Sequence, residues 1–249
     1  MFNHTWSTGK AEQPEANASH STSLFLAKIF FSTEGASQPR WLFGAAVFLV
    51  SVPVFIEAPL VRHLPLVSLI LTGGWVWLSL MLISHRRTEV WGDLLLGFSG
   101  SWLAGSLYWG CMRWEPLLHL PIEAIGLPMA IWCIQRRQWL VGSWFYLGSI
   151  AGTAVTDLYF YLVNLMDHWR QLMRVEPELA PPIMQSAVSL VKTPWGLGCA
   201  AVLAAVLLVT GFVGLGLGMR REKDLHWWGF SGAVLSTILV DSLFFLAAN

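Results

Sequence analysis

Seven apolar runs of about 20 residues follow residue 40, and they constrain the fold more than any other feature of this chain. About 20 apolar residues in a helix are needed to cross the ~30 Å hydrocarbon core of a membrane. Only 12% of the 249 residues are charged, about half the share in a soluble domain. The sequence therefore predicts an all-α, polytopic membrane helix bundle of about seven transmembrane helices. The expected spans are 41–60, 64–83, 92–111, 116–135, 140–166, 195–219 and 229–248.

The parts outside these runs predict two further regions beside the transmembrane domain, 40–249. Residues 1–39 are polar and without helical period, so we expect a mostly disordered tail, in which the apolar run 24–31 could lie on the membrane surface. The loop 167–194 predicts two surface helices, the first ended by Pro177, Pro181 and Pro182. They would form either a lid over an outer cavity or an ordinary interfacial pair. The candidate lid residues are Trp169, Arg170, Arg174, Glu176 and Glu178.

Basic residues predict the orientation of the chain in the membrane. The pairs Arg86–Arg87, Arg136–Arg137 and Arg220–Arg221 all fall in connections on the same side as the N-terminus. Cytoplasmic loops carry an excess of Lys and Arg. We therefore expect a cytoplasmic N-terminus and a C-terminus on the periplasmic or lumenal side.

Ionisable residues inside the apolar runs are the main functional signal. Glu115, His119 and Glu123 recur every four residues, which places them on one stripe of a helix. Pro121 should bend that helix, because it leaves the carbonyl of Leu117 without its helical donor. Ionisable side chains within a membrane are costly and usually face a protein interior or a water-filled cavity.

Acids on four predicted helices lie in the same outer leaflet. Glu123, Asp157 and Asp241 are expected roughly 10 to 13 Å from the outer helix ends, and Glu57 lies nearer the surface. Each acid could simply be a hydrogen-bonded link between helices. Their common depth instead favours an outer, water-accessible cavity in which they share protons or hold a cation or polar ligand. The cavity candidates are Glu57, Glu115, His119, Glu123, Asp157, Tyr159, Tyr161 and Asp241.

Other motifs indicate packing or exclude function classes. Gly148 with Gly152, and Gly214 with Gly218, have the four-residue spacing that allows close helix contact. The zero net charge gives no reason to expect nucleic acid as a partner. The three cysteines show no disulfide or metal spacing, and the spacing of Glu115, His119 and Glu123 does not favour a metal site. No cofactor is identified by any motif, and no catalytic signature is present.

Five runs of the sequence carry a resemblance to known proteins: 41–55, WEPLLHLPIEAIGLP at 114–128, TAVTDLYFY at 153–161, 175–182 and 232–241. Together they resemble, over residues 41–249, a cyanobacterial family of integral membrane proteins of unknown function. This resemblance implies a photosynthetic prokaryote and a location in the thylakoid or plasma membrane. A fainter likeness links Pro121-Ile122-Glu123 to small membrane carotenoid cyclases, although Ala124 replaces their second acid.

Three functions follow as hypotheses. The first is a non-enzymatic membrane protein that handles a pigment, lipid or quinone, or that assists assembly of a photosynthetic complex. Its partners would be the lipid bilayer and photosynthetic membrane proteins or pigments. The second is a proton-coupled small-molecule transporter that uses Glu123, Asp157 and Asp241. The third is an isoprenoid- or carotenoid-modifying enzyme in which Glu123 or Asp157 protonates a double bond.

Overall fold

The computed structural model describes residues 38–221 and 224–248, which form helices and connections without a strand. The predicted all-α fold is confirmed. The long helices are α2 (Gln38–His63), α3 (Pro65–Ile83), α4 (Glu89–Cys111), α7 (Leu140–Leu162), α10 (Pro194–Arg220) and α11 (His226–Ala248). The predicted tail lies outside the described residues, apart from Gln38 and Pro39, which begin α2.

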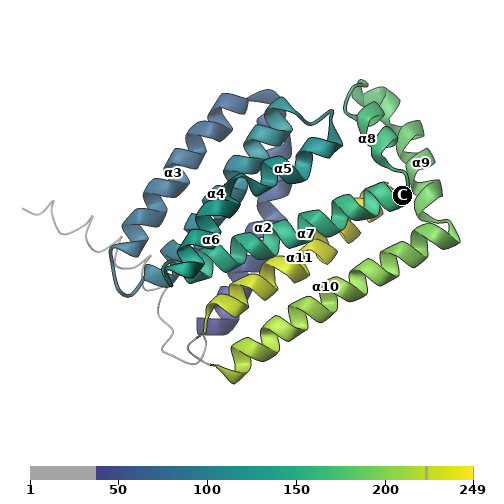
Figure 1. Ribbon diagram of the computed structural model, residues 1–249. Helices are drawn as coiled ribbons and strands as arrows, with labels where there is room; N and C mark the ends of the chain where they lie inside the picture. The colour runs from purple at the N-terminus through teal and green to yellow at the C-terminus, as the bar shows by residue number, and fades with distance from the viewer. Residues whose placement is uncertain (1–37, 222–223, 249) are drawn as a thin grey trace, which may run out of the picture. The chain divides into compact units, whose positions relative to one another are not determined.

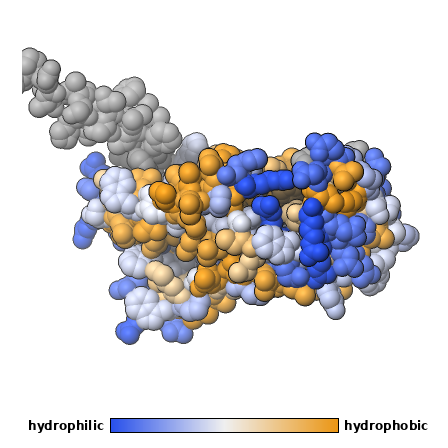
Figure 2. Space-filling model, turned by 90° about the horizontal axis from the view of Figure 1, so that it is seen from above, coloured by the Kyte–Doolittle hydropathy of each residue, from blue (hydrophilic) through white to orange (hydrophobic). Residues whose placement is uncertain are grey.

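Within residues 38–221 and 224–248, five helical stretches are long and apolar enough to cross a membrane. They are α2, α3, the stretch Pro116–Gln135, α10 and most of α11. α4 and α7 have 23 residues each, which is sufficient length, but they are rich in Gly, Ser and other polar residues and are not among the five. The predicted count of seven spans is therefore not confirmed, although each predicted span is mostly helical. In the view of Figure 2, hydrophobic side chains gather over the middle of the bundle and hydrophilic ones toward its ends.

The interior of the bundle lies where α4, α7 and α11 pack together and against α2 (Figure 1). Its core is built from large apolar side chains of α2, α4 and α7 together with a small residue of α11. Leu42, Phe98, Trp102, Phe145 and Ala233 form its centre. By contrast, α3 and α10 expose large apolar residues, such as Ile70, Trp77 and Phe212. Such outward apolar faces are expected of helices that contact lipid.

Glycines set the closest helix contacts. A Cβ on Gly148 would lie 2.6 Å from the carbonyl oxygen of Phe230, and one on Gly152 would collide with the Thr237 hydroxyl. Side chains would likewise collide at Gly214 and Gly218, which face α11 from α10. The close contacts predicted from both glycine pairs are confirmed. Gly148 and Gly152 therefore let α7 lie directly against α11.

Asp93 joins α4 to the beginning of α7. Its carboxylate oxygens accept hydrogen bonds from the backbone N–H groups of Val141 (2.8 Å) and Gly142 (3.0 Å). The first N–H groups of a helix lack partners within the helix and favour a negative charge. Gly142 also lies against the backbone of Asp93 and Gly97, where a side chain would collide. Asp93 thus caps α7 from a neighbouring helix.

The loop 167–194 contains the two short helices predicted there, α8 (Met166–Leu172) and α9 (Ala180–Val191). α8 ends at Leu172, before the prolines that we expected to end it, so that detail of the prediction is wrong. Pro181 and Pro182 instead occupy the first turn of α9. Proline is tolerated there because the first helical N–H groups have no partner within the helix.

Candidate functional site

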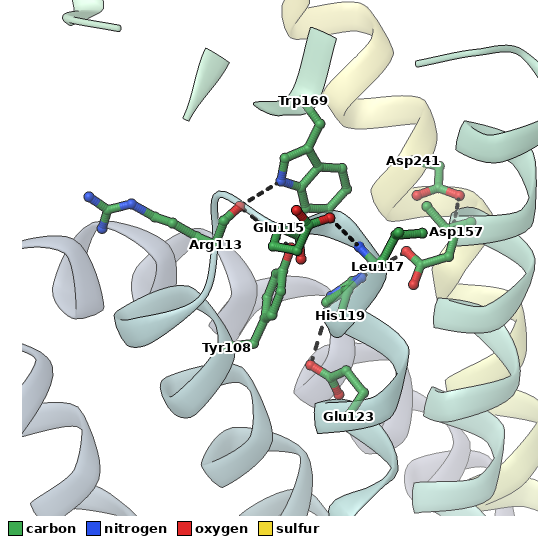
Figure 3. Close-up of polar contacts among 10 residues, drawn as sticks. Tyr108, Arg113, Glu115, Leu117, His119, Glu123, Asp157, Trp169 and Asp241 are labelled. Carbon is green, nitrogen blue, oxygen red and sulfur yellow. Dashed lines mark hydrogen bonds and ion pairs between the residues drawn. The ribbon is translucent and has the colours of Figure 1, made fainter. Parts of the chain in front are cut away.

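His119 is the centre of a buried group of titratable side chains (Figure 3). Its Nδ1 lies 2.8 Å from Asp157 Oδ1, and its Nε2 lies 4.0 Å from Glu123 Oε1. The first contact is a hydrogen bond, whereas the second is too long for one and leaves room for reorientation or a bridging water. The imidazole therefore stands between two carboxylates. We call His119, Glu123 and Asp157 the acid–histidine cluster.

The side chains of the acid–histidine cluster are mostly, but not completely, buried. The three side chains are 11–13% exposed. No lysine or arginine occurs in α5 (His119–Glu123), α7 or α11, so these helices supply no cation to the acids. An ionised carboxylate that is removed from water without a partner is strongly destabilised. Among the side chains of these helices, His119 is the group that lies within 4.0 Å of both carboxyl groups.

α7 presents two different faces to its neighbours. Asp157, which contacts His119, lies on one of them. Thr156 lies on the other face, with Gly148 and Gly152, and its hydroxyl donates to Asp241 Oδ2 of α11 at 2.9 Å. Asp241 is close enough to Asp157 for the two carboxyl groups to interact electrostatically. The structure thus brings Glu123, Asp157 and Asp241 into one region, with His119 between the first two.

Aromatic rings cover the cluster. The centroid of the Tyr108 ring lies 4.4 Å from that of the His119 ring, and the centroid of the Trp169 ring, in α8, lies 5.5 Å from it. Trp169 stacks on Trp109 at 5.7 Å, and its indole N–H donates to the carbonyl oxygen of Arg113 at 2.8 Å (Figure 3). Among the predicted lid residues, Trp169 is therefore the one that contacts His119 directly.

Glu115 does not lie on the helical stripe predicted for it. It precedes η1 (Pro116–Leu118) in an extended conformation, because the helical stretch begins only at Pro116. Its carboxylate binds the guanidinium of Arg170 at 2.8 Å, and Arg170 also contacts Asp167 at 2.9 Å. The hydrogen bond from Arg170 lowers the pKa of Glu115, and Glu115 raises the pKa of Arg170. Glu115 therefore anchors α8 rather than joining the acid–histidine cluster.

Glu57 occupies a separate niche beside α4. Ser106 donates a 3.0 Å hydrogen bond to Glu57 Oε1, and the hydroxyls of Ser106 and Ser68 lie 2.6 Å apart. A Cβ on Gly105 would lie 3.0 Å from the carboxylate, so this glycine makes room for Glu57. Glu57 and Glu123 also interact electrostatically. Glu57 is thus connected to the cluster through charge, not through a direct hydrogen bond.

The helical stretch that carries His119 and Glu123 changes to a 3₁₀ turn on each side of α5. α5 itself runs through Pro121, which lies in its first turn, and η1, which contains Leu117, precedes it. The second turn, which interrupts the α-helix, is η2 (Ala124–Gly126), before α6 (Leu127–Gln135) begins. There the Tyr146 hydroxyl of α7 donates to the Glu123 carbonyl and accepts from the Gly126 N–H. Sequence reasoning missed Tyr146, since nothing local to either segment signals a contact across 20 residues.

The remaining predicted site residues lie away from His119. The Tyr159 hydroxyl is buried near Asp241 and Cys199, without a hydrogen-bond partner among the described residues. Tyr161 is 65% exposed, so the structure does not bring it into the cluster. Glu176 and Glu178 are exposed. Arg174 interacts electrostatically with Glu115.

Two cavities lie beside α7, and no residue of the acid–histidine cluster lines either of them. The larger, of about 420 Å³, is lined by Tyr161, Leu162, Asn164, Met166, Asp167 and Arg170, where α7 passes into α8. The smaller, of about 80 Å³, lies between α4, α6 and α7, lined by Asp93, Gly100, Gly126, Cys133 and Tyr146. Sites for drug-sized molecules have volumes of roughly 300 Å³ or more. Within the described ranges, no group of three or more His, Cys, Asp and Glu residues is arranged to hold a metal ion.

Comparisons with known proteins address the family rather than the activity. No curated protein and no solved structure matches the chain. A family model described as "Protein of unknown function (DUF3120)" matches residues 46–249. The match includes every residue of the acid–histidine cluster, the interrupted helix and α8. Since it covers most of the 249 residues, the chain belongs to this family of proteins of unknown function.

Proposed function

We propose that this protein is a proton-coupled membrane transporter for a small molecule, and that the acid–histidine cluster is its proton-binding site. The observation that carries the proposal is the position of His119, between Asp157 and Glu123 on an interrupted membrane helix. Chains of Asp, Glu and His side chains are used as proton relays in membrane pumps and transporters.

The geometry supports a defined proton transfer. With Nδ1 protonated, His119 donates to Asp157, and its unprotonated Nε2 faces Glu123. A protonated Glu123 carboxyl that closes the 4.0 Å gap would give its proton to Nε2, while the Nδ1 proton passes to Asp157. One proton thereby moves from Glu123 to Asp157, and the imidazole changes only its tautomer. A reverse transfer or a ring flip restores the starting state.

The interrupted helix supports transport over a purely structural role. Substrate and coupling-ion sites of secondary transporters are typically formed by discontinuous membrane helices. His119 and Glu123 lie in the short piece α5, between two 3₁₀ turns. α2, which carries Glu57, contains Pro53 and Pro59, each of which removes a helical hydrogen bond. Acids on weakened helices can change position at lower energetic cost than acids on regular ones.

α8 would act as the outer gate of this site. Trp169 covers His119, and Arg170 holds α8 to Glu115 through an ion pair whose two side chains are only 29% and 34% exposed. Because both side chains still contact water, this pair can open and close at a lower cost than a buried one. With the N-terminus cytoplasmic, as the basic residues predict, this gate would face the periplasm or lumen.

The other functions inferred from the sequence have less support. The two cavities, of about 80 and 420 Å³, are not lined by His119, Glu123 or Asp157, so neither connects the acid–histidine cluster with a pigment, lipid or quinone. Roles in lipid handling, photosynthetic complex assembly or isoprenoid chemistry remain predictions, as do the cyanobacterial source and the thylakoid or plasma membrane location.

Proton movement in proteoliposomes tests the proposal. The full chain would be reconstituted with a pH-sensitive dye inside, under a potassium clamp. Separate additions of amino acids, organic acids, sugars and inorganic cations would follow. We expect at least one class to cause a pH change that Asp157→Asn and Glu123→Gln abolish. Asp224→Asn is the control, because Asp224 pairs with Arg221 in the connection between α10 and α11.

Two results together would overturn transport. One is the absence of any protein-dependent pH change with all four classes of solute. The other is full rescue of a gene-deletion phenotype by Asp157→Asn, which retains shape but cannot release a proton. Asp157 would then be a hydrogen-bonded link between helices.

A further inference from the structure

We infer that Tyr146 is a positioning residue for the proton site, because its hydroxyl holds open the helix break that places Glu123 beside His119. The inference rests on the proposed function. It assigns a role to a side chain whose hydroxyl hydrogen-bonds the backbone of Glu123 and Gly126, and not the side chain of a proton carrier.

The hydroxyl replaces hydrogen bonds that a continuous helix would make. In an uninterrupted α-helix, the Glu123 carbonyl would accept from the Leu127 N–H, and the Gly126 N–H would donate to the Ile122 carbonyl. Instead, the Tyr146 hydroxyl donates to the Glu123 carbonyl and accepts from the Gly126 N–H at 2.8 Å. A side chain inserted into the helical hydrogen-bond ladder is a recognised cause of kinks.

The neighbours of Tyr146 are suited to this insertion. Tyr146 is 3% exposed, so its ring is fixed in the bundle. A Cβ on Gly126 would lie 2.8 Å from both the Tyr146 hydroxyl oxygen and the ring carbon that carries it. Only glycine at position 126 therefore lets the phenol reach the backbone. Pro128 weakens the same region, since it cannot donate a hydrogen bond to the Ala124 carbonyl.

Tyr146 and Asp157 act on the interrupted helix from one face of α7. They are 11 residues apart, which is about three helical turns. Asp157 binds His119, while Tyr146 binds the backbone at Glu123 and Gly126. α7 therefore holds α5 at both of its ends. If the break closed, α5 would be turned relative to α6, and the alignment of Glu123 with His119 would be lost.

The test pairs a structural readout with a functional one. Ile125-Gly126 is the only Ile-Gly dipeptide in the chain, so ¹³C-Ile and ¹⁵N-Gly labelling gives one NMR signal for the Gly126 amide. We expect Tyr146→Phe to move this signal. The matched control is Tyr159→Phe, which removes a buried hydroxyl that has no partner among the described residues and should leave the signal in place.

The functional readout is the coupling between His119 and Glu123. Infrared spectroscopy would follow the carboxyl band that Glu123→Gln removes. We expect His119→Gln to change the proton affinity of Glu123 roughly tenfold, one unit on the pH scale, in the otherwise native protein. In the Tyr146→Phe variant, His119→Gln should change the proton affinity of Glu123 by less than about twofold. Gly126→Ala, which displaces the phenol by another route, should reproduce this loss of coupling.

The outcomes separate the inference from the proposed function. An unmoved Gly126 signal in Tyr146→Phe would overturn the inference, whatever the protein transports. So would an equal effect of His119→Gln in both backgrounds. If Glu123 does not titrate in the native protein, the proposed function fails, and the Gly126 signal still decides whether Tyr146 holds the break open.

Discussion

Asp93 and Asp157 are aspartates in the same bundle, yet their partners differ in kind. Asp93 accepts hydrogen bonds from two backbone N–H groups, which cannot exchange a proton with it under physiological conditions. Asp157 instead contacts His119, whose imidazole can act both as a proton donor and as a proton acceptor. The comparison teaches that the chemistry of the partner, more than burial, separates an acid that builds the fold from one suited to function.

The backbone contact beside Asp93 offers the largest expected effect. Gly142→Ala should lower the free energy of unfolding by about 3 kcal/mol, because the new methyl group would meet the backbone of Asp93 and Gly97 and neither can move aside. Denaturant titration in detergent measures the change. Gly44→Ala is the control, since no atom lies within 4 Å of its Cβ position, and it should not destabilise the fold. Equal stability of the two variants would show that α4 and α7 can separate at this point.

The two aspartates can be compared directly through asparagine. Asp93→Asn should cost about 2 kcal/mol, because an amide cannot accept from both N–H groups with the strength of a carboxylate. Asp157→Asn should cost less than about 1 kcal/mol, since asparagine can still bond to His119. Unfolding free energies measured side by side test this difference. A larger loss at Asp157 would make it the structural acid of the pair.

Glu57 provides an intermediate case. Ser106→Ala should cost about 1 kcal/mol, because it removes the donor to Glu57 and the partner of Ser68. Ser101→Ala, on the same helix, removes a buried hydroxyl with no partner among the described residues and should be neutral or slightly stabilising. Thermal melting of both variants is the measurement. If their melting temperatures agree, the Glu57–Ser106 bond adds nothing to stability.

The smallest expected effect concerns the pH dependence of α8. Arg170 lowers the pKa of Glu115, so the ion pair contributes fully above the ordinary value of about 4.3 and is lost as the pH falls through the lowered value. Hydrogen-exchange protection of α8 should therefore decrease below about pH 4. In Arg170→Gln, protection should already be low at pH 7. α9 has no charged residue and serves as the internal control. Unchanged hydrogen-exchange protection of α8 in Arg170→Gln would show that the ion pair does not hold the proposed gate closed.

Local sequence patterns predicted most of the helices but little of the site geometry. The apolar run 41–60 lies within α2, and Gly148 and Gly152 meet α11 as their spacing indicated. These features depend on hydropathy and spacing within one segment. The break at Ala124–Gly126 instead depends on Tyr146 from another helix, and the cap on α7 depends on Asp93. Contacts of this kind are tertiary, so no local pattern in the sequence reveals them.

The polarity of α4 and α7 bears on how the chain is made. Helices with polar and charged residues enter the bilayer poorly on their own. α4 can pack on α3, which precedes it, but the Gly148 and Gly152 face of α7 matches α11, which is synthesised after α10. Chains truncated before His226 should therefore place a glycosylation reporter located after α7 on both sides of microsomal membranes, whereas the full chain should place it on one. A single location for the truncated chain would show that α7 inserts unaided. Biosynthesis thus leaves a polar helix without its partner until α11 has been made, so loss of α11 would expose the chain to membrane quality control.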